Sequence, residues 1–128
     1  MRELLFQARR LPEDELDKGG FVFGLPQYDV DGRITSLCNW YNGRENIIPE
    51  TICQYIGLKD SARMKIFEND LIKVSPDSDV TYRVMYDSDS AQFVLNRIDG
   101  NEVKYTKIPI CRELLSESVV FGNAIDEV

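Results

Sequence analysis

Residues 80–95 read Val-Thr-Tyr-Arg-Val-Met-Tyr-Asp-Ser-Asp-Ser-Ala-Gln-Phe-Val-Leu, and this stretch decides the fold class. On both sides of the polar turn at 87–90, apolar side chains occupy every second position. Such alternation is typical of strands with one buried face, and the short turn predicts that the two strands pair as a hairpin. Asp99-Gly100 marks another turn before a strand expected at 103–106, so the second half of the chain is predicted to be a β-meander.

The same pattern extends toward both ends of this half. Strands are expected at 71–74 and 118–122, which gives roughly five short strands from Leu71 onward. Strands of this number and length predict either an SH3-like barrel or a strongly bent small sheet. Proline suits the first position of a helix, so Pro109 followed by 110–115 predicts one short helix.

The first half of the chain is also rich in hairpin signals. Apolar residues alternate at 4–8 and 21–25, and Asp31-Gly32 joins two further runs at 28–30 and 33–37. Asp-Gly favours tight hairpin turns because it accepts positive φ at low cost. We therefore predict a mainly β protein with a hairpin-rich N-terminal lobe at 1–48 and an SH3-like lobe at 49–128, which together form one compact unit.

The composition of the chain disfavours several classes of function. The chain has 128 residues, of which 43% are hydrophobic, and its 15 Lys and Arg against 22 Asp and Glu give a net charge of −7. The negative charge disfavours adhesion to nucleic acid or to anionic lipid. No run of about 18 apolar residues is present, so no membrane span is expected, and the N-terminus does not read as a signal peptide.

Histidine is absent, and cysteine is scarce. The lack of histidine excludes Ser-His-Asp and Cys-His catalysis and any zinc site that uses imidazole. Cys38, Cys53 and Cys111 are odd in number and form no C-x-x-C pair, which fits neither a disulfide framework nor a four-cysteine zinc site. We expect reduced thiols in core or half-buried strand positions, and a cytoplasmic location.

The centre of the chain carries a family resemblance. Residues 48–60, Ile-Pro-Glu-Thr-Ile-Cys-Gln-Tyr-Ile-Gly-Leu-Lys-Asp, and 65–74, Lys-Ile-Phe-Glu-Asn-Asp-Leu-Ile-Lys-Val, resemble the signature of the YopX-like family of phage and prophage proteins. The start at 1–8 and the close at 120–123 are similar to those of the family as well. The chain departs from the family pattern at two places. Asn69 stands where the family usually has glycine, and the spacing near the end differs because Phe121 comes just ahead of Gly122. The signature positions are Pro49, Glu50, Thr51, Gln54, Tyr55, Gly57, Leu58, Asp60, Glu68, Asp70, Gly122 and Asn123.

The resemblance implies where the protein is encoded and where it acts, but not which reaction or ligand it serves. It implies a protein encoded by a phage or prophage that acts in the cytoplasm of the host bacterium. It also implies a β-rich fold with an SH3-like portion that self-assembles. The family brings no catalytic residues to carry over, so the signature positions are predicted to serve architecture or the binding of a partner.

Several acidic residues are candidates for a chemical role. Glu68 and Asp70 could act as an acid–base pair, but an acidic residue before a strand commonly orders its turn. The pairs Asp77/Asp79 and Asp87/Asp89 offer oxygen ligands for Ca²⁺ or Mg²⁺, but neither has the length or the glycine of an EF-hand loop. We therefore predict no catalytic residue, no metal site and no cofactor.

Two other clusters invite a binding interpretation. Gln54, Tyr55 and Gly57 form the polar centre of the signature, where glycine more often marks a bulge or a close approach of backbones. Aromatic residues also gather in the N-terminal half, and such clusters are more often core than a stacking platform. Those residues are Phe21, Phe23, Tyr28, Trp40 and Tyr41.

The function predicted from the sequence is non-enzymatic. We expect an accessory protein that binds protein and forms a homo-oligomer, because short strands in a small domain leave unpaired edges. A host or phage protein is a further expected partner. One alternative is an acidic mimic of nucleic acid, which requires the carboxylates at 13–15, Asp77, Asp79, Asp87 and Asp89 to share one face. The other alternative is a small Mg²⁺-dependent hydrolase or nuclease, which requires two of these acids to converge in a pocket.

Overall fold

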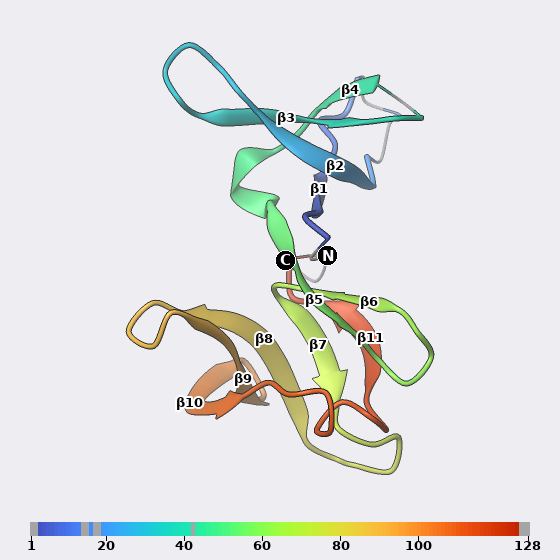
Figure 1. Cartoon of the computed structure of the whole chain (residues 1–128), viewed down its shortest axis with the longest axis vertical. Coiled ribbons are helices and arrows are strands. Elements are labelled where there is room, and N and C mark those ends of the chain that lie inside the picture. The colour runs from blue at the N-terminus through green and yellow to red at the C-terminus, as the bar shows by residue number, and fades with distance from the viewer. Residues whose placement is uncertain (1–2, 14–15, 17–18, 42, 126–128) are drawn as a thin grey trace. The chain divides into compact units, whose positions relative to one another are not determined.

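The computed structural model describes residues 3–13, 16, 19–41 and 43–125, and within them the regular secondary structure consists almost wholly of antiparallel strands (Figure 1). The mainly β prediction is confirmed. Contacts divide the chain into two compact units, residues 1–55 and 56–128, with the boundary inside strand β5 rather than after Ile48. Within each unit the fold follows from which face of each strand is apolar.

The strands form two sheets, neither of which closes into a barrel. The first sheet has the order β4-β3-β2-β1-β5-β6, and the second has the order β10-β9-β8-β7-β11. The bounds in the first sheet are β1 Phe6–Arg9, β2 Phe21–Tyr28, β3 Ile34–Asn39, β4 Gly43–Asn46, β5 Cys53–Lys59 and β6 Lys65–Phe67. In the second sheet they are β7 Asp70–Lys73, β8 Thr81–Asp87, β9 Gln92–Asp99, β10 Glu102–Pro109 and β11 Val119–Asn123.

The N-terminal unit is built around the β2–β3 hairpin. β2 pairs with β1 on one side and with β3 on the other. The predicted hairpin is confirmed, although its turn is longer than Asp31-Gly32 alone. One carboxylate oxygen of Asp29 accepts hydrogen bonds from the backbone N–H groups of Asp31 and Arg33, both at 2.9 Å, so this Asx-type turn spans 29–33. Alternation along the strands buries Ala8, Leu37 and Ile47 in a small core.

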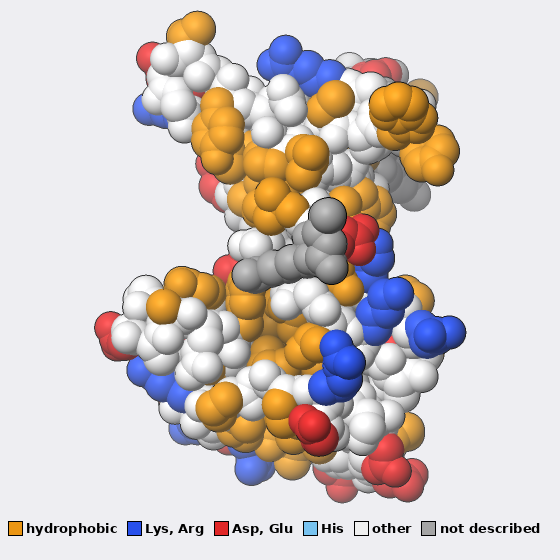
Figure 2. Space-filling view, in the orientation of Figure 1, with side chains coloured by type: hydrophobic (Ala, Val, Ile, Leu, Met, Phe, Trp, Pro, Cys, Tyr) orange, Lys and Arg blue, Asp and Glu red, His pale blue; other side chains and the backbone are white. Residues whose placement is uncertain are grey.

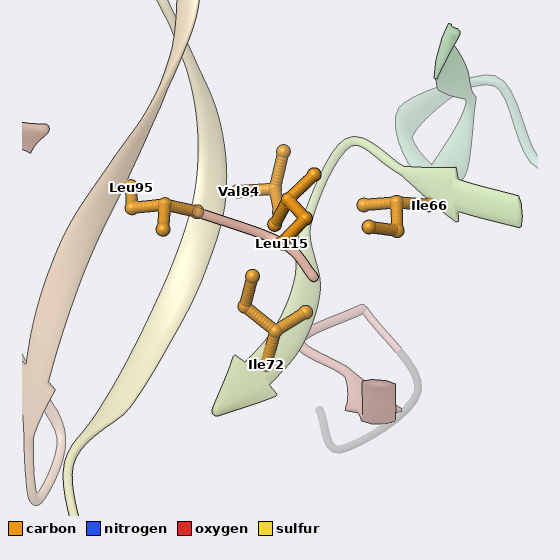
Figure 3. Packing of buried hydrophobic residues seen from close by; sticks show 5 residues of the cluster. All are labelled: Ile66, Ile72, Val84, Leu95 and Leu115. Atoms are coloured by element: carbon orange, nitrogen blue, oxygen red, sulfur yellow. The ribbon is translucent and has the colours of Figure 1, made fainter. Parts of the chain in front are cut away.

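The C-terminal unit contains the predicted meander of β8, β9 and β10. β7 pairs with β8 and also with β11, so the last strand returns to the start of this sheet. The core-facing positions of the strands and of the connection after β10 meet in one apolar cluster (Figure 3). Its fully buried members are Ile66, Ile72, Val84, Leu95 and Leu115.

Two local predictions are wrong. Residues 110–115 do not form a helix, because Pro109 completes β10 opposite Val94 and the segment after it makes only turns with hydrogen bonds between residues three apart. In these turns the N–H of Leu115 donates to the carbonyl of Arg112 at 3.2 Å, and Leu115 is held in the core. Of the two architectures predicted for the second half, the SH3-like barrel does not form, because the second sheet ends in the separate edge strands β10 and β11, and the alternative of a small open sheet is the one that the structure has. The short helix that does form is a 3₁₀ turn, η1, at Pro49–Thr51, where the sequence pattern predicts the start of a strand at Thr51.

The cysteines divide by position. Cys53 is buried, and Cys38 is half-buried in β3. Cys111 is exposed in the turn segment after β10, which differs from the strand or core position expected for it. All three are free thiols.

Candidate functional site

The turn between β6 and β7 carries the acidic part of the signature and is closed by hydrogen bonds. Asp70 is buried, with 5% of its surface exposed, and accepts from the N–H of Phe67 at 2.8 Å. Its second oxygen accepts from the side-chain amide of Asn123 at 2.9 Å. The same amide lies 3.4 Å from the carbonyl of Glu68. Two signature elements that lie far apart in sequence are thus tied together in the C-terminal unit.

Burial gives Asp70 a perturbed acidity. Desolvation raises the pKa of Asp70 to about 6, although the hydrogen bonds from Asn123 and Phe67 act in the opposite direction. A carboxyl group with such a pKa could exchange protons near neutral pH. Both of its oxygens are occupied by internal donors, however, so the geometry makes Asp70 a structural tie rather than a group open to a substrate.

Asp60 also holds two segments of the C-terminal unit together through hydrogen bonds. One of its oxygens accepts from the N–H groups of Ala62 and Met64, both at 2.9 Å, which orders the loop between β5 and β6. The other oxygen accepts from the N–H of Val120 in β11 at 3.0 Å. Gly122 follows in β11, opposite Leu71, beyond a register shift. The signature acids therefore fix the path of β11.

Thr51 performs the equivalent task in the N-terminal unit. Its hydroxyl accepts from the N–H of Arg9 at 2.9 Å and donates to the carbonyl of Ile48 at 2.7 Å, which joins η1 to β1. Pro49 begins η1, and Glu50 in the same turn is exposed.

The signature residues of β5 also serve the backbone. Gln54 lies opposite Phe6, and the N–H of the buried Tyr55 donates to the carbonyl of Leu5 at 2.9 Å. Gly57 adopts φ of +92°, which only glycine accepts readily, and Leu58 packs against the C-terminal core. The described signature side chains therefore do not converge on a reaction centre.

The acidic pairs proposed as a mimic or a metal site lie at different places. Asp77 and Asp79 precede β8, whereas Asp87 ends it and Asp89 lies in the turn after it, so a strand of about 20 Å separates the pairs. Among residues 3–13, 16, 19–41 and 43–125, no three Asp, Glu or Cys side chains are grouped as a metal ion would require. Asp14 and Glu15 lie outside the described residues.

Asp87 also lies beside a basic residue. Its carboxylate accepts from the hydroxyl of Ser90 at 2.6 Å, and the ammonium group of Lys107 lies 3.5 Å away. The Ser90 hydrogen bond, aided by Lys107, lowers the pKa of Asp87. Lys107 lies 3.9 Å from Asp89 as well, so basic charge interrupts this acidic turn.

The aromatic cluster expected in the N-terminal core is mostly on the surface, so that prediction is wrong. Trp40 is 95% exposed and Tyr41 is 91% exposed. The side chain of Asn39 holds their turn, because its amide donates to the carbonyl of Phe23 at 2.8 Å and its oxygen accepts from the N–H of Tyr41 at 2.9 Å. The pair therefore extends beyond the end of β3. The sequence signal for this position was the polar residue on each side of the pair.

Exposed apolar residues continue along the β2–β3 hairpin. Because Val22 and Leu37 face the small core, alternation places Phe23 and Leu25 on the opposite side of β2. Figure 2 shows hydrophobic side chains gathered on this part of the N-terminal unit. We call this set the hairpin apolar surface, and it consists of Phe23, Leu25, Tyr28, Val30, Trp40 and Tyr41.

Comparison with known proteins shows to which family the chain is similar. The family model described as YopX protein matches residues 27–123, which is 97 of the 128 residues. No curated protein matches the chain. Within the described residues, no helix is long and apolar enough to cross a membrane.

Proposed function

This chain belongs to the YopX family, and we propose that it is a non-enzymatic accessory protein that acts by binding protein. Its first partner in this proposal is a second copy of itself. The protein is encoded by a phage or prophage, and it works in the cytoplasm of the host bacterium. The three free cysteines fit a reducing compartment of this kind.

The hairpin apolar surface is the observation that carries the proposal. Monomeric proteins seldom expose contiguous apolar patches, and aromatic residues are enriched where proteins meet. Trp40 and Tyr41 expose almost their whole side chains, and Phe23 and Leu25 are nearly half exposed. Covering these groups would remove a large apolar area from water, which is the main driving force of association.

An edge strand lies beside this surface and favours a second copy as the partner, although the carbonyl of Asn46 at its end already accepts from the N–H of Leu11 at 2.9 Å. β4 begins two residues after Tyr41 and is the last strand at its end of the first sheet. An edge strand presents unpaired N–H and C=O groups, which another strand can complete. A second copy offers the same edge and the same apolar residues, so that a two-fold contact would be complementary to itself.

Light scattering coupled to size exclusion at micromolar concentration tests the proposal. The wild-type chain is expected to elute as a dimer or larger assembly. The double variant Trp40→Ser/Tyr41→Ser is expected to elute as a monomer. Tyr105→Ser is the matched control, because Tyr105 is an aromatic residue of the other unit that is 68% exposed, and this variant should still assemble. A monomeric wild type, or assembly that survives the double variant, would overturn the proposal.

A further inference from the structure

We propose that the C-terminal unit carries a binding pocket for a small amphipathic carboxylate, with Arg83 as the group that receives the carboxylate. The pocket lies wholly in residues 71–124, whereas the hairpin apolar surface lies in residues 23–41. The two proposals can therefore succeed or fail separately.

The pocket occupies the face of the second sheet that points away from the core. Ile72, Val84 and Leu95 point into the core, so their neighbours in the strands point to the other side. The register places Leu71 opposite Arg83, and Thr81 and Val103 on either side of Ile98. These side chains share one face, and together with Phe121 of β11 and the β9–β10 turn they line a half-open pocket of about 470 Å³.

The volume and the lining suit a small molecule. Pockets of about 300 to 1,000 Å³ that are largely apolar with a few polar groups are typical of ligand sites. Leu71, Ile98, Val103 and Phe121 supply the apolar walls, and Thr81 and Asn101 add a hydroxyl and an amide. A ligand for this pocket needs an apolar body.

The guanidinium of Arg83 is held in a fixed orientation by a neutral group. Its Nε and one terminal nitrogen donate to the side-chain oxygen of Asn69 at 3.1 and 2.8 Å. Asn69 lies in the signature turn with φ of +70°, and its own N–H donates to the carbonyl of Val84 at 2.7 Å. The asparagine that replaces the usual glycine of the signature is therefore the residue that positions Arg83.

Arg83 lacks a compensating anion in the part of the chain that the structure describes. Within residues 3–13, 16, 19–41 and 43–125, no carboxylate forms an ion pair with it. A second cation lies near the pocket, because the ammonium group of Lys73 is 5.5 Å from the centre of the Phe121 ring. In a chain with a net charge of −7, this local positive charge favours an anionic ligand group.

The chemistry of the cation selects the ligand class. Guanidinium groups bind carboxylates through charge-assisted hydrogen bonds, which are stronger than bonds between neutral groups. Asn69 leaves one terminal nitrogen of Arg83 without a protein partner among the described residues. A molecule with one carboxylate and an apolar chain or ring would satisfy both this nitrogen and the apolar walls.

The test is a titration followed by amide NMR spectra of the full chain. The probes are octanoate and phenylbutyrate, with octanamide as the neutral analogue of octanoate and acetate as the head group alone. We expect saturable shifts of the Gly100, Asn101 and Ala124 amides with octanoate. Binding of octanamide and of acetate should be at least about tenfold weaker, as the loss of a charged hydrogen bond or of the apolar contact predicts.

Three variants assign the effect to Arg83. Arg83→Gln is expected to weaken octanoate binding by about tenfold or more. Asn69→Gly keeps the positive φ but removes the side-chain oxygen, so binding should weaken several-fold while the turn persists. Arg97→Gln is the matched control, because Arg97 lies on the next strand and is paired with Asp99 at 3.0 Å, and this variant should bind as the wild type does.

Several outcomes would overturn the proposal. They are the absence of saturable shifts with both acids, equal affinity for octanoate and octanamide, or shifts confined to the hairpin apolar surface. Unchanged binding by a folded Arg83→Gln variant would also overturn it. Should that variant fail to give the spectrum of a folded protein, the comparison of octanoate with octanamide and the Asn69→Gly variant decide the matter.

Discussion

The two units are built from the same kind of antiparallel strand, yet they differ in how many of their large apolar side chains are exposed. The N-terminal unit buries Ala8, Leu37 and Ile47 as its core, whereas the C-terminal unit buries a five-residue cluster around Leu95. Among the residues that the structure describes in the two units, nine large apolar ones are exposed in the first, namely Leu4, Leu11, Leu16, Phe23, Leu25, Tyr28, Val30, Trp40 and Tyr41. Four are exposed in the second, namely Met64, Tyr86, Tyr105 and Phe121.

This difference in exposure fits a different role for each unit. The C-terminal unit packs its apolar side chains into a core of its own. The buried carboxylates of Asp60 and Asp70 hold its turns in place through hydrogen bonds. The N-terminal unit leaves much of its apolar area to water, which costs free energy unless something covers it. Under the proposed function, the C-terminal unit is the stable scaffold and the N-terminal unit supplies the surface for association.

The largest effect should come from the scaffold core. Leu95→Ala removes a fully buried side chain and should lower the free energy of unfolding by about 2 to 5 kcal/mol. Urea unfolding followed by circular dichroism measures this change, with Tyr105→Ala as the exposed control. A loss below about 1 kcal/mol would mean that the site repacks and that the C-terminal core is not the main source of stability.

Asp70 should give the scaffold a distinctive pH dependence. Its pKa is about 6 in the folded chain against 3.8 for an unperturbed aspartate, so the folded state holds the proton more tightly. Stability from this group is therefore fully present below about pH 4 and falls as the pH rises through 6, by up to about 3 kcal/mol.

The matched comparison for this effect is Asp70→Asn. The difference in unfolding free energy between the wild type and the variant should change by up to about 3 kcal/mol between about pH 4 and about pH 7. The wild type should lose stability relative to the variant as the pH rises. Parallel curves would show that the carboxyl group is not held in the buried environment described.

Gly24 tests how tightly the N-terminal unit is built. A Cβ atom at this position would lie 2.8 Å from the carbonyl carbon of Cys38, so Gly24→Ala must push β2 and β3 apart. We expect a loss of about 1 to 3 kcal/mol, measured by hydrogen exchange of the β2 and β3 amides. Phe23→Ala, which changes an outward-facing neighbour, is the control. Unchanged protection in Gly24→Ala would mean that the hairpin accommodates the methyl group.

The smallest effect on stability should come from Trp40. Because its side chain is 95% exposed, Trp40→Ala should change the unfolding free energy by no more than about 0.5 kcal/mol at concentrations where the chain is monomeric. Thermal unfolding of dilute protein measures this. A much larger loss would show that Trp40 packs within its own unit, and the contrast between the two units would then disappear.

The sequence predicts the strands of the meander well because their signal is local, whereas β4 and β6 are not among the predicted strands. Alternation at 80–95 and the turn residues at 87–90 and 99–100 are sufficient to place β8, β9 and β10. The error at 110–115 arises because proline suits a helix start and also the end of an edge strand that needs no N–H partner there. Tertiary pairing with Val94 decides between these choices, and alternation does not report it.

The predicted roles of particular side chains depend on contacts that spacing does not contain. The bonds from Asp60 to Val120 and from Asp70 to Asn123 join residues 60 and 53 positions apart. The exposure of Trp40 and Tyr41 depends on where β3 ends, which the Asn39 side chain fixes. The pocket around Arg83 likewise requires the register of five strands. Sequence reasoning could name most of these residues but could not place them.

Quenching of the fluorescence of Trp40, the single tryptophan of the chain, tests the central claim most directly. In dilute protein, acrylamide should quench Trp40 almost as fully as it quenches free tryptophan, because the side chain is exposed. As the concentration rises through the micromolar range, quenching should decrease and the emission should shift to shorter wavelength as a second copy covers the hairpin apolar surface. Quenching that stays complete at every concentration would contradict the account, even if the protein assembles through another surface.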